Sequence, residues 1–286
     1  MKSDGPSRTA LMVAGQRAAH QLLDHGAILN DPYAIRILGG DKDDVLQVLN
    51  GHPLASVGRL LTAARSRIAE DAVSKAVERG VRQVVILGAG LDTFALRNPH
   101  GETIRVFEVD HPTTQAWKRQ RLEGAELALP PWLIFVPVDF EQDDLQQLSS
   151  NGLNPGSAAF FTWLGVVPYL TRDAIDNTLG YIASIPNSEV VFDYIEPPET
   201  WAEEMKADAA ARMAQLEKIK EQWVSHFEPA GIAAILRSHG FDEIKDSSFQ
   251  QVVCRFGHYV QGLAPAQAGV HIVHAKHQHL PRRKVG

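Results

Sequence analysis

The sequence has little cysteine, no long hydrophobic run and no strong excess of either charge. Cys254 is the only cysteine, which excludes an internal disulfide framework and a cysteine-rich zinc site. No stretch approaches the ~20 apolar residues of a membrane-spanning helix, and the first apolar run ends too soon, at Gln16, for a signal peptide. A formal net charge of −6 argues against a nucleic-acid partner held by phosphate contacts. We therefore expect a soluble, cytoplasmic protein with neither a membrane nor a nucleic acid as partner.

What is present is an ordinary globular composition over 286 residues, with 44% hydrophobic and 22% charged residues. Residues 1–80 read as helical, because apolar side chains recur at helical spacing over 9–23 and 55–80. From residue 81 onward, short β-branched runs alternate with helical patterns. The predicted strands are 84–87, 104–109, 133–138, 158–163 and 189–194, with weaker strands at 242–246 and 270–275. The predicted helices between and after them are 113–126, 143–149, 172–185 and 229–241.

This alternation predicts an α/β fold whose mostly parallel sheet is covered on both faces. A long charged helix-forming stretch, residues 200–223, interrupts the pattern, and we interpret it as a lid inserted over the carboxyl edge of the sheet. The predicted organisation is a helical N-terminal cover over 1–80 and a core over 81–286, with the lid at about 197–226. The sequence gives no indication of oligomeric state.

The stretch VVILGAGLDTFALR (84–97) joins the first predicted strand to a glycine turn formed by Gly88, Ala89 and Gly90. Two glycines after a strand let the backbone approach a ligand closely. A dinucleotide fingerprint needs a third glycine before a phosphate-binding helix, and Asp92 follows instead. A carboxylate beside a pyrophosphate would repel it, whereas the same carboxylate suits a ligand with a positive group.

The second predicted strand ends in two acids, Glu108 and Asp110, at about the separation from the glycines at which an acid meets a ribose diol. Asp110 has an alternative interpretation, in which it caps a helix that opens at Pro112 and Thr113. The two interpretations cannot be separated by spacing.

Several motifs in a fixed order resemble the leucine carboxyl methyltransferase-like family, whose members use S-adenosylmethionine (SAM). They are VVILGAGLDTFALR followed by VFEVDHPTTQAWKRQRL, SRTALMVAGQRAAHQLL with NDPYAIRIL near the start, AARSR at 63–67, FFTWLGVVPYLT at 160–171 and FDYIEPP at 192–198. The resemblance implies a class I SAM-dependent methyltransferase fold, Rossmann-like, with a seven-stranded mostly parallel sheet, a helical N-terminal cover and a helical lid.

The resemblance also implies cofactor contacts on this chain. Arg65 would pair with the methionine carboxylate, Gly88 would lie against the cofactor, Asp110 would hold the ribose, and Asp139 and Phe140 would bracket the adenine. These roles match the chemistry of SAM, which has a carboxylate, a diol and a sulfonium that favours negative or aromatic neighbours. The predicted cofactor site consists of these five residues together with four from the two motifs above, namely Ala89, Gly90, Asp92 and Glu108.

One position departs from the family pattern. Leu164 stands where many relatives have a glutamate, which removes one polar contact to the amino-acid end of the cofactor and one candidate catalytic carboxylate. Candidates for a base or orienting group are therefore sought at strand ends and in the lid. They are Tyr169, Asp193, Tyr194, Glu196 and His226, each of which also fits a packed aromatic or a solvated polar side chain.

Histidines elsewhere do not predict a metal site. His271 and His274 point to opposite faces of a strand, and His277 and His279 lie in the tail. His20 in the first helix fits a buried, hydrogen-bonded side chain.

The sequence thus predicts a SAM-dependent methyltransferase that acts on a carboxylate or hydroxyl oxygen of a small-molecule acceptor. Methyl transfer from a sulfonium needs mainly alignment and exclusion of water, and only a hydroxyl acceptor profits from a base. Two alternatives are an NAD(P)-dependent oxidoreductase, which Asp92 opposes, and a non-catalytic SAM-binding protein, which the loss at Leu164 would suit.

Overall fold

A seven-stranded sheet forms the centre of the computed structural model, which describes residues 7–39, 55–201, 203, 206, 217, 221–263 and 269–277. The strand order is β3-β2-β1-β4-β5-β7-β6. The first five strands are parallel, and β7 runs antiparallel to both β5 and β6. This confirms the predicted mostly parallel α/β fold. The strands are β1 Gln83–Leu87, β2 Arg105–Asp110, β3 Leu133–Pro137, β4 Ala159–Trp163, β5 Glu189–Ile195, β6 Glu243–Ser248 and β7 Val270–Lys276.

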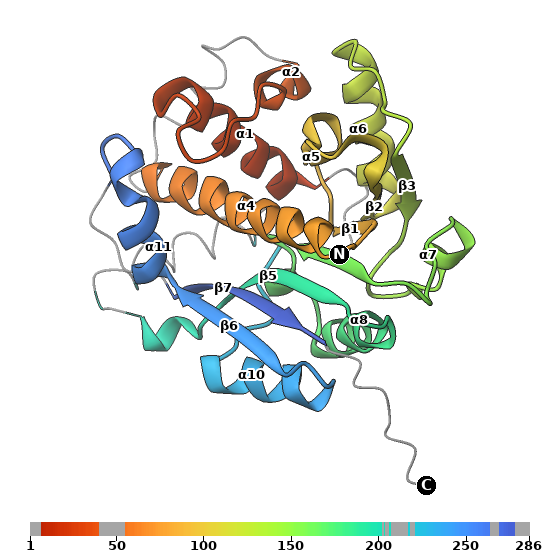
Figure 1. Cartoon of the computed structure of the whole chain (residues 1–286). Coiled ribbons are helices and arrows are strands. Elements are labelled where there is room, and N and C mark those ends of the chain that lie inside the picture. The colour runs from red at the N-terminus through yellow and green to blue at the C-terminus, as the bar shows by residue number, and fades with distance from the viewer. Residues whose placement is uncertain are drawn as a thin grey trace, which may run out of the picture.

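Alternate residues of each central strand enter two hydrophobic cores, one on each face of the sheet. In β1, Val85 and Leu87 pack into the core that also holds residues of α8 and α10, and Val84 and Ile86 pack into the core shared with α4 and α11. In Figure 1 the long α4 crosses one face, while α8 and α10 lie beyond the other. Continuous burial on both faces explains the unbroken apolar runs of the strands. The helices are α1 Arg8–Leu23, α2 Ala34–Leu38, α4 Ala55–Glu78, α5 Phe94–Arg97, α6 Pro112–Gly124, α7 Gln147–Ser150, α8 Arg172–Ser184, α10 Pro229–Ser238 and α11 Phe249–Phe256.

The N-terminal helices pack on one another through small side chains and a buried polar network. Ala18 and Ala19 of α1 are fully buried. The His20 Nε2 accepts hydrogen bonds from the backbone N–H groups of Ile28 (3.2 Å) and Leu29 (3.3 Å), so Nδ1 carries the proton and donates to Asp24 (3.0 Å). His20 is therefore a buried structural histidine.

The observed strands match the predicted ones to within two residues at each end, whereas some helices differ. Helix α7 is shorter than the predicted 143–149, because Asp139 and Asp144 form turns with the backbone of Glu141 and Gln146 before the helix begins. The short α2 lies within the region predicted to be helical, whereas the short α5 and the longer α11 were not predicted. Most of the predicted lid lies outside the described residues; within it, 3₁₀ turn η3 (Pro198–Thr200) and the irregular stretch 221–226 are described.

The two central strands, β1 and β4, lie side by side although the chain leaves them in opposite directions across the sheet. A ligand crevice forms at such a switch point, beyond the carboxyl ends of the strands. Over the described ranges, no helix combines the length and apolar character needed to cross a membrane. Within those same ranges, no three histidine, cysteine or acidic side chains are grouped as metal ligands.

Candidate active site

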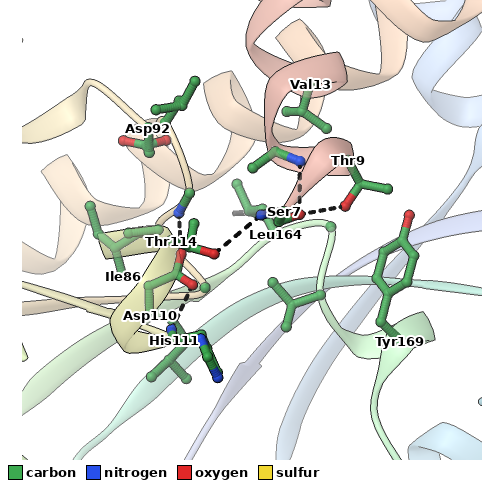
Figure 2. A pocket seen from close by; sticks show the side chains of 18 of the residues that line it. Ser7, Thr9, Val13, Ile86, Asp92, Asp110, His111, Thr114, Leu164 and Tyr169 are labelled. Carbon is green, nitrogen blue, oxygen red and sulfur yellow. Dashed lines mark hydrogen bonds between the residues drawn. The ribbon is translucent and has the colours of Figure 1, made fainter. Parts of the chain in front are cut away.

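A cavity opens at the switch point, beyond the carboxyl ends of β1, β2 and β4. It offers about 130 Å³ to the centres of water molecules, whereas one water needs about 10–15 Å³. Figure 2 shows its wall, with α1 above and the ends of the strands below. Its lining includes most of the predicted cofactor site, namely Arg65, Gly88, Ala89, Gly90, Asp92, Asp110, Asp139 and Phe140.

The glycine turn forms the floor of this cavity. Gly88 (φ +68°) and Gly90 (φ +47°) have left-handed backbones that favour glycine. A Cβ on Gly88 would overlap the side chain of Val166, and one on Gly90 would lie 3.1 Å from the Cβ of Ala10 in α1. The lack of a side chain at these two glycines therefore lets Val166 and α1 pack closely against the turn.

Asp110, the last residue of β2, binds the glycine turn directly. Its carboxylate accepts hydrogen bonds from the backbone N–H groups of Gly90 and His111, the latter at 2.7 Å. Burial raises the pKa of Asp110 in spite of these donors. It does not cap α6, because the His111 side chain does so by accepting from the Thr113 N–H (3.3 Å).

Asp92 stands where a dinucleotide fingerprint would continue toward its third glycine. Removal from water raises its pKa, but the charges of Arg17, Arg97 and Lys118 and a hydrogen bond from the Phe94 N–H (2.6 Å) outweigh that effect, so the pKa is lowered. A carboxylate held in its charged form at this point opposes a pyrophosphate and suits a cation.

Glu108 does not line the cavity, although it stands two residues before Asp110. It is 1% exposed, and its carboxylate binds the Lys118 ammonium of α6 at 2.6 Å. Burial raises the pKa of Glu108 to about 7, against the effect of Lys118. Of the two acids at the end of β2, only Asp110 faces the cavity, because Glu108 is engaged inside the protein.

Arg65 reaches the cavity from α4 and contacts the end of β4. Its Nη1 donates to Asp193 of β5 at 2.9 Å, and its guanidinium lies against Gly165, where a Cβ would stand 2.7 Å from Nη2. Arg67, two residues on, is itself exposed and instead pairs with the partly buried Asp71 on the outside of the helix. A guanidinium has five N–H donors, so Arg65 keeps donors for a carboxylate in the cavity.

Asp139 and Phe140 follow β3 at the other end of the cavity. Asp139 Oδ1 accepts from the Glu141 N–H at 3.0 Å, and the Phe140 ring lies 6.5 Å from the Trp163 ring. The turn thus presents one carboxylate and one aromatic face beside Asp110.

Of the candidate catalytic side chains, Tyr169 alone lines the cavity. Figure 2 shows its ring rising from the turn after β4 toward the first turn of α1. The other candidates do not line the cavity, namely Asp193, Tyr194, Glu196 and His226. The Tyr194 hydroxyl donates to Asp246 (2.7 Å), and the Glu196 carboxylate lies 3.5 Å from His271. The backbone carbonyl of His226 accepts a hydrogen bond from Arg172.

Several lining residues were missed by sequence reasoning. They are chiefly the first turns of α1, which contribute Ser7, Thr9, Ala10, Val13 and Arg17, and the strand-end residues His111, Glu141 and Thr162. Arg17 donates to the Leu91 carbonyl of the glycine loop and to Asp31 (3.1 Å). Helical spacing in residues 9–23 predicted the helix but carried no signal of what it faces.

The cavity brings together the glycine turn, the acid at the end of β2 and the Arg65 guanidinium. The model of the family described as leucine carboxyl methyltransferase matches residues 10–183. The chain belongs to this family. A protein of Mycolicibacterium smegmatis described as a "Putative S-adenosyl-L-methionine-dependent methyltransferase" is 34% identical over 252 residues, which are 82% of this chain and 75% of the other.

Other similarities agree with the family and the fold. A Bacillus subtilis protein with the same description, YktD, is 40% identical over 139 residues, which are 46% of this chain and 45% of the other, so the match spans less than half of that relative. The crystal structure of the CurJ carbon methyltransferase superposes with a TM-score of 0.52 at 16% identity, covering 95% of this chain and 67% of that one. This likeness shows the class I methyltransferase fold.

Proposed function

We propose that this family member, whose cofactor is SAM, transfers the methyl group to a hydroxyl oxygen of a small, uncharged molecule. The observation that carries the proposal is the set of side chains around one cavity, in which a guanidinium, two glycines and a carboxylate are spaced along the edge of the sheet. Each of these matches one part of SAM.

The residues present fit this cofactor. Gly88 and Gly90 line the cavity with backbone alone, and Asp110 has lone pairs beyond those used by the backbone N–H groups. In the proposal Asp110 accepts from the ribose hydroxyls and Arg65 donates to the methionine carboxylate. Asp139 and Phe140 bracket the adenine, and Asp92 supplies negative charge near the positive groups. Glu108 has no direct part.

When bound, SAM supplies an activated methyl group that an oxygen nucleophile attacks in line. The protein has to align the acceptor and exclude water, for which the first turn of α1 and the turn after β4 form a roof and a side wall. Tyr169 stands between the two, where its hydroxyl can orient an acceptor oxygen.

The charges of the wall favour a hydroxyl over a carboxylate as acceptor. Among the described lining residues, the permanent cations are Arg17 and Arg65, against the carboxyl groups of Asp92, Asp110, Asp139 and Glu141. Arg17 is engaged by Asp31 and the Leu91 carbonyl, and Arg65 serves the methionine end in the proposal. A second carboxylate would therefore meet like charges, which disfavours its binding.

The rival functions differ in what they bind and release. An oxidoreductase would bind NAD(P). The Asp92 carboxylate, which would repel a pyrophosphate, and the family membership both argue against this. A non-catalytic SAM-binding protein would bind SAM without turnover. Calorimetric titration with SAM, S-adenosylhomocysteine and NAD separates these functions, and SAM binding without NAD binding is expected.

An acceptor screen by mass spectrometry then tests the proposed chemistry. Phenols and alcohols paired with carboxylic acids of similar size are incubated with SAM, and products heavier by one CH₂ are treated with alkali. Alkali-stable methyl ethers support the proposal, and alkali-labile methyl esters would overturn the choice of a hydroxyl. No product from a broad panel despite SAM binding would favour a non-catalytic role.

A further inference from the structure

Glu221 forms a buried link between the chain that follows residues 202–220 and the start of α1. Its side chain is 2% exposed. Oε1 accepts from the Arg8 N–H at 2.6 Å, and Oε2 accepts from the Thr9 N–H at 2.9 Å and the Ser7 hydroxyl at 3.2 Å. One carboxylate therefore satisfies several donors of the first helical turn, more than 200 residues away in sequence.

The turn that Glu221 holds is part of the cavity wall. Ser7, Thr9, Ala10 and Val13 line the cavity, and Figure 2 shows Ser7 and Thr9 above the strand ends. The Ser7 N–H also donates to Thr114 Oγ1 at 3.4 Å across the cavity edge. Further along α1, Arg17 fixes the helix to the glycine loop. The first turn depends on Glu221 because its free N–H groups have no partner within the helix.

We propose that Glu221 is a positioning residue that holds the first turn of α1 over the cofactor and so slows its escape. The proposal rests on the proposed binding of SAM in this cavity. A carboxylate stabilises the N-terminus of α1 in two ways. It accepts hydrogen bonds from N–H groups that have no partner within the helix, and it lies at the positive end of the helix dipole. Without its charge the first turn frays, and the wall loses the backbone that carries Ser7 and Thr9.

The test compares Glu221→Gln with Glu189→Gln. Glu189 is also a buried acid, 5% exposed, bound by Arg79 and by His274 at 2.9 Å, but it begins β5 at the opposite end of the sheet from the cavity. Both variants are expected to lower the midpoint of unfolding. Only Glu221→Gln is expected to raise the dissociation rate of SAM, by about tenfold, the loss typical of a charge-assisted contact at a helix start. Stopped-flow displacement of SAM by S-adenosylhomocysteine measures this rate.

Amide hydrogen exchange is a second measurement of the same contact. It can be made even if Glu221→Gln is less stable than the wild type. The Arg8 and Thr9 amides should exchange slowly in the wild type and in Glu189→Gln, fast in Glu221→Gln, and at an intermediate rate in Glu221→Asp, which keeps the charge on a shorter side chain. Equal SAM dissociation in the two glutamine variants would overturn the positioning role and leave the proposed function standing. A wild type that binds SAM without transferring its methyl group would remove the proposed function and leave this role standing.

Discussion

Two parts of the same sheet edge gather acids, histidines and tyrosines, and they use them in opposite ways. At the cavity, Asp110 and Asp92 are held by backbone N–H groups and keep acceptor capacity toward the open space. Beside the antiparallel strands, Tyr194, Asp246 and His271 bind one another, with Tyr194–Asp246 and His271–Asp246 distances of 2.7 and 2.8 Å. We call this second set the β5–β7 cluster.

The difference separates a binding site from a structural network. In the β5–β7 cluster each polar group finds its partner in the protein, and burial together with Asp246 raises the pKa of Tyr194, so the phenol stays protonated. Its ring stacks on His271 with centroids 5.0 Å apart. At the cavity the partners are backbone groups, which fix the carboxylates without using up all their lone pairs. The proposed function uses this spare acceptor capacity beside the cavity.

The largest expected effect comes from removing one aspartate on each side of this comparison. Asp110→Ala should weaken SAM binding by about 100-fold, since a carboxylate that accepts from hydroxyls contributes roughly 1.5–3 kcal/mol. Asp246→Ala should leave SAM affinity within about twofold and lower the free energy of unfolding by about 1–3 kcal/mol, because it removes the partner of the Tyr194 hydroxyl and of His271 Nδ1. Titration calorimetry and denaturant unfolding measure the two quantities. Unchanged SAM binding in Asp110→Ala would contradict the assignment of the ribose contact.

A smaller effect is expected from two arginines of α4 that point in different directions. Arg65→Lys should weaken SAM binding by about tenfold, because a lysine has no fork of donors to serve Asp193 and a carboxylate together. Arg67→Lys, whose side chain is half exposed beside Asp71, should change neither binding nor stability measurably. SAM titrations of the pair check this, and equal losses in both would show that Arg65 acts only through helix stability.

Two tyrosines provide a third contrast, one expected to affect the methyl-transfer rate and the other the free energy of unfolding. Tyr169→Phe should lower methyl transfer about tenfold with SAM affinity and stability unchanged, the loss expected when one oriented hydroxyl is removed. Tyr194→Phe should lower the free energy of unfolding by about 1 kcal/mol and leave transfer unchanged. Single-turnover rates with an accepted hydroxyl substrate and denaturant unfolding form the assay. A loss of transfer in Tyr194→Phe would undo the distinction between the two regions.

The smallest effect concerns pH and the buried network around His20. Burial lowers the pKa of His20 in spite of Asp24, so the unfolded chain binds the proton more tightly than the folded one. Stability is therefore fully present above pH ~6.5, the unfolded value, and falls as the pH drops toward the lower folded value. Protonation of Nε2 would also set it against the Ile28 and Leu29 N–H groups. Unfolding free energies between pH 7.5 and 5.5 should fall more steeply for the wild type than for His20→Asn. Equal slopes would exclude His20 as the titrating group.

The sequence was sufficient to predict the strands and the glycine turn, because those features are local, whereas the seven-stranded arrangement came from the family resemblance. Apolar runs with flanking turns marked the strands, and Gly88 and Gly90 stood directly after the first of them. Helix α11 could also have been predicted, since Ser248 and Gln251 form a capping box at its start.

The division of the acids could not be predicted, because it depends on partners from other elements. Glu108 and Asp110 look equivalent in the sequence because both stand near the end of the same strand. They differ in the structure because Lys118 of α6 binds Glu108. Tyr194 and Glu196 lie at the carboxyl end of β5 much as Asp139 lies just beyond β3, but the antiparallel β7 brings His271 against them. Residues 200–223 contain several acids, and no pattern among them indicated that Glu221 would bind the first turn of α1.

The hydrogen bonds that shape the glycine turn all come from within the protein. The Gly88 and Ala89 N–H groups donate to the Val109 carbonyl at 2.8 and 3.0 Å, and the Gly90 N–H donates to Asp110. The residue that accepts from the ribose in the proposal thus also closes the loop on which the cofactor rests. Association then requires little ordering of the chain at this point, and the favourable contacts are expressed as affinity rather than consumed in folding the loop. Preorganisation of this kind makes the turn a rigid template, so differences in acceptor choice among such proteins would arise in the surrounding walls.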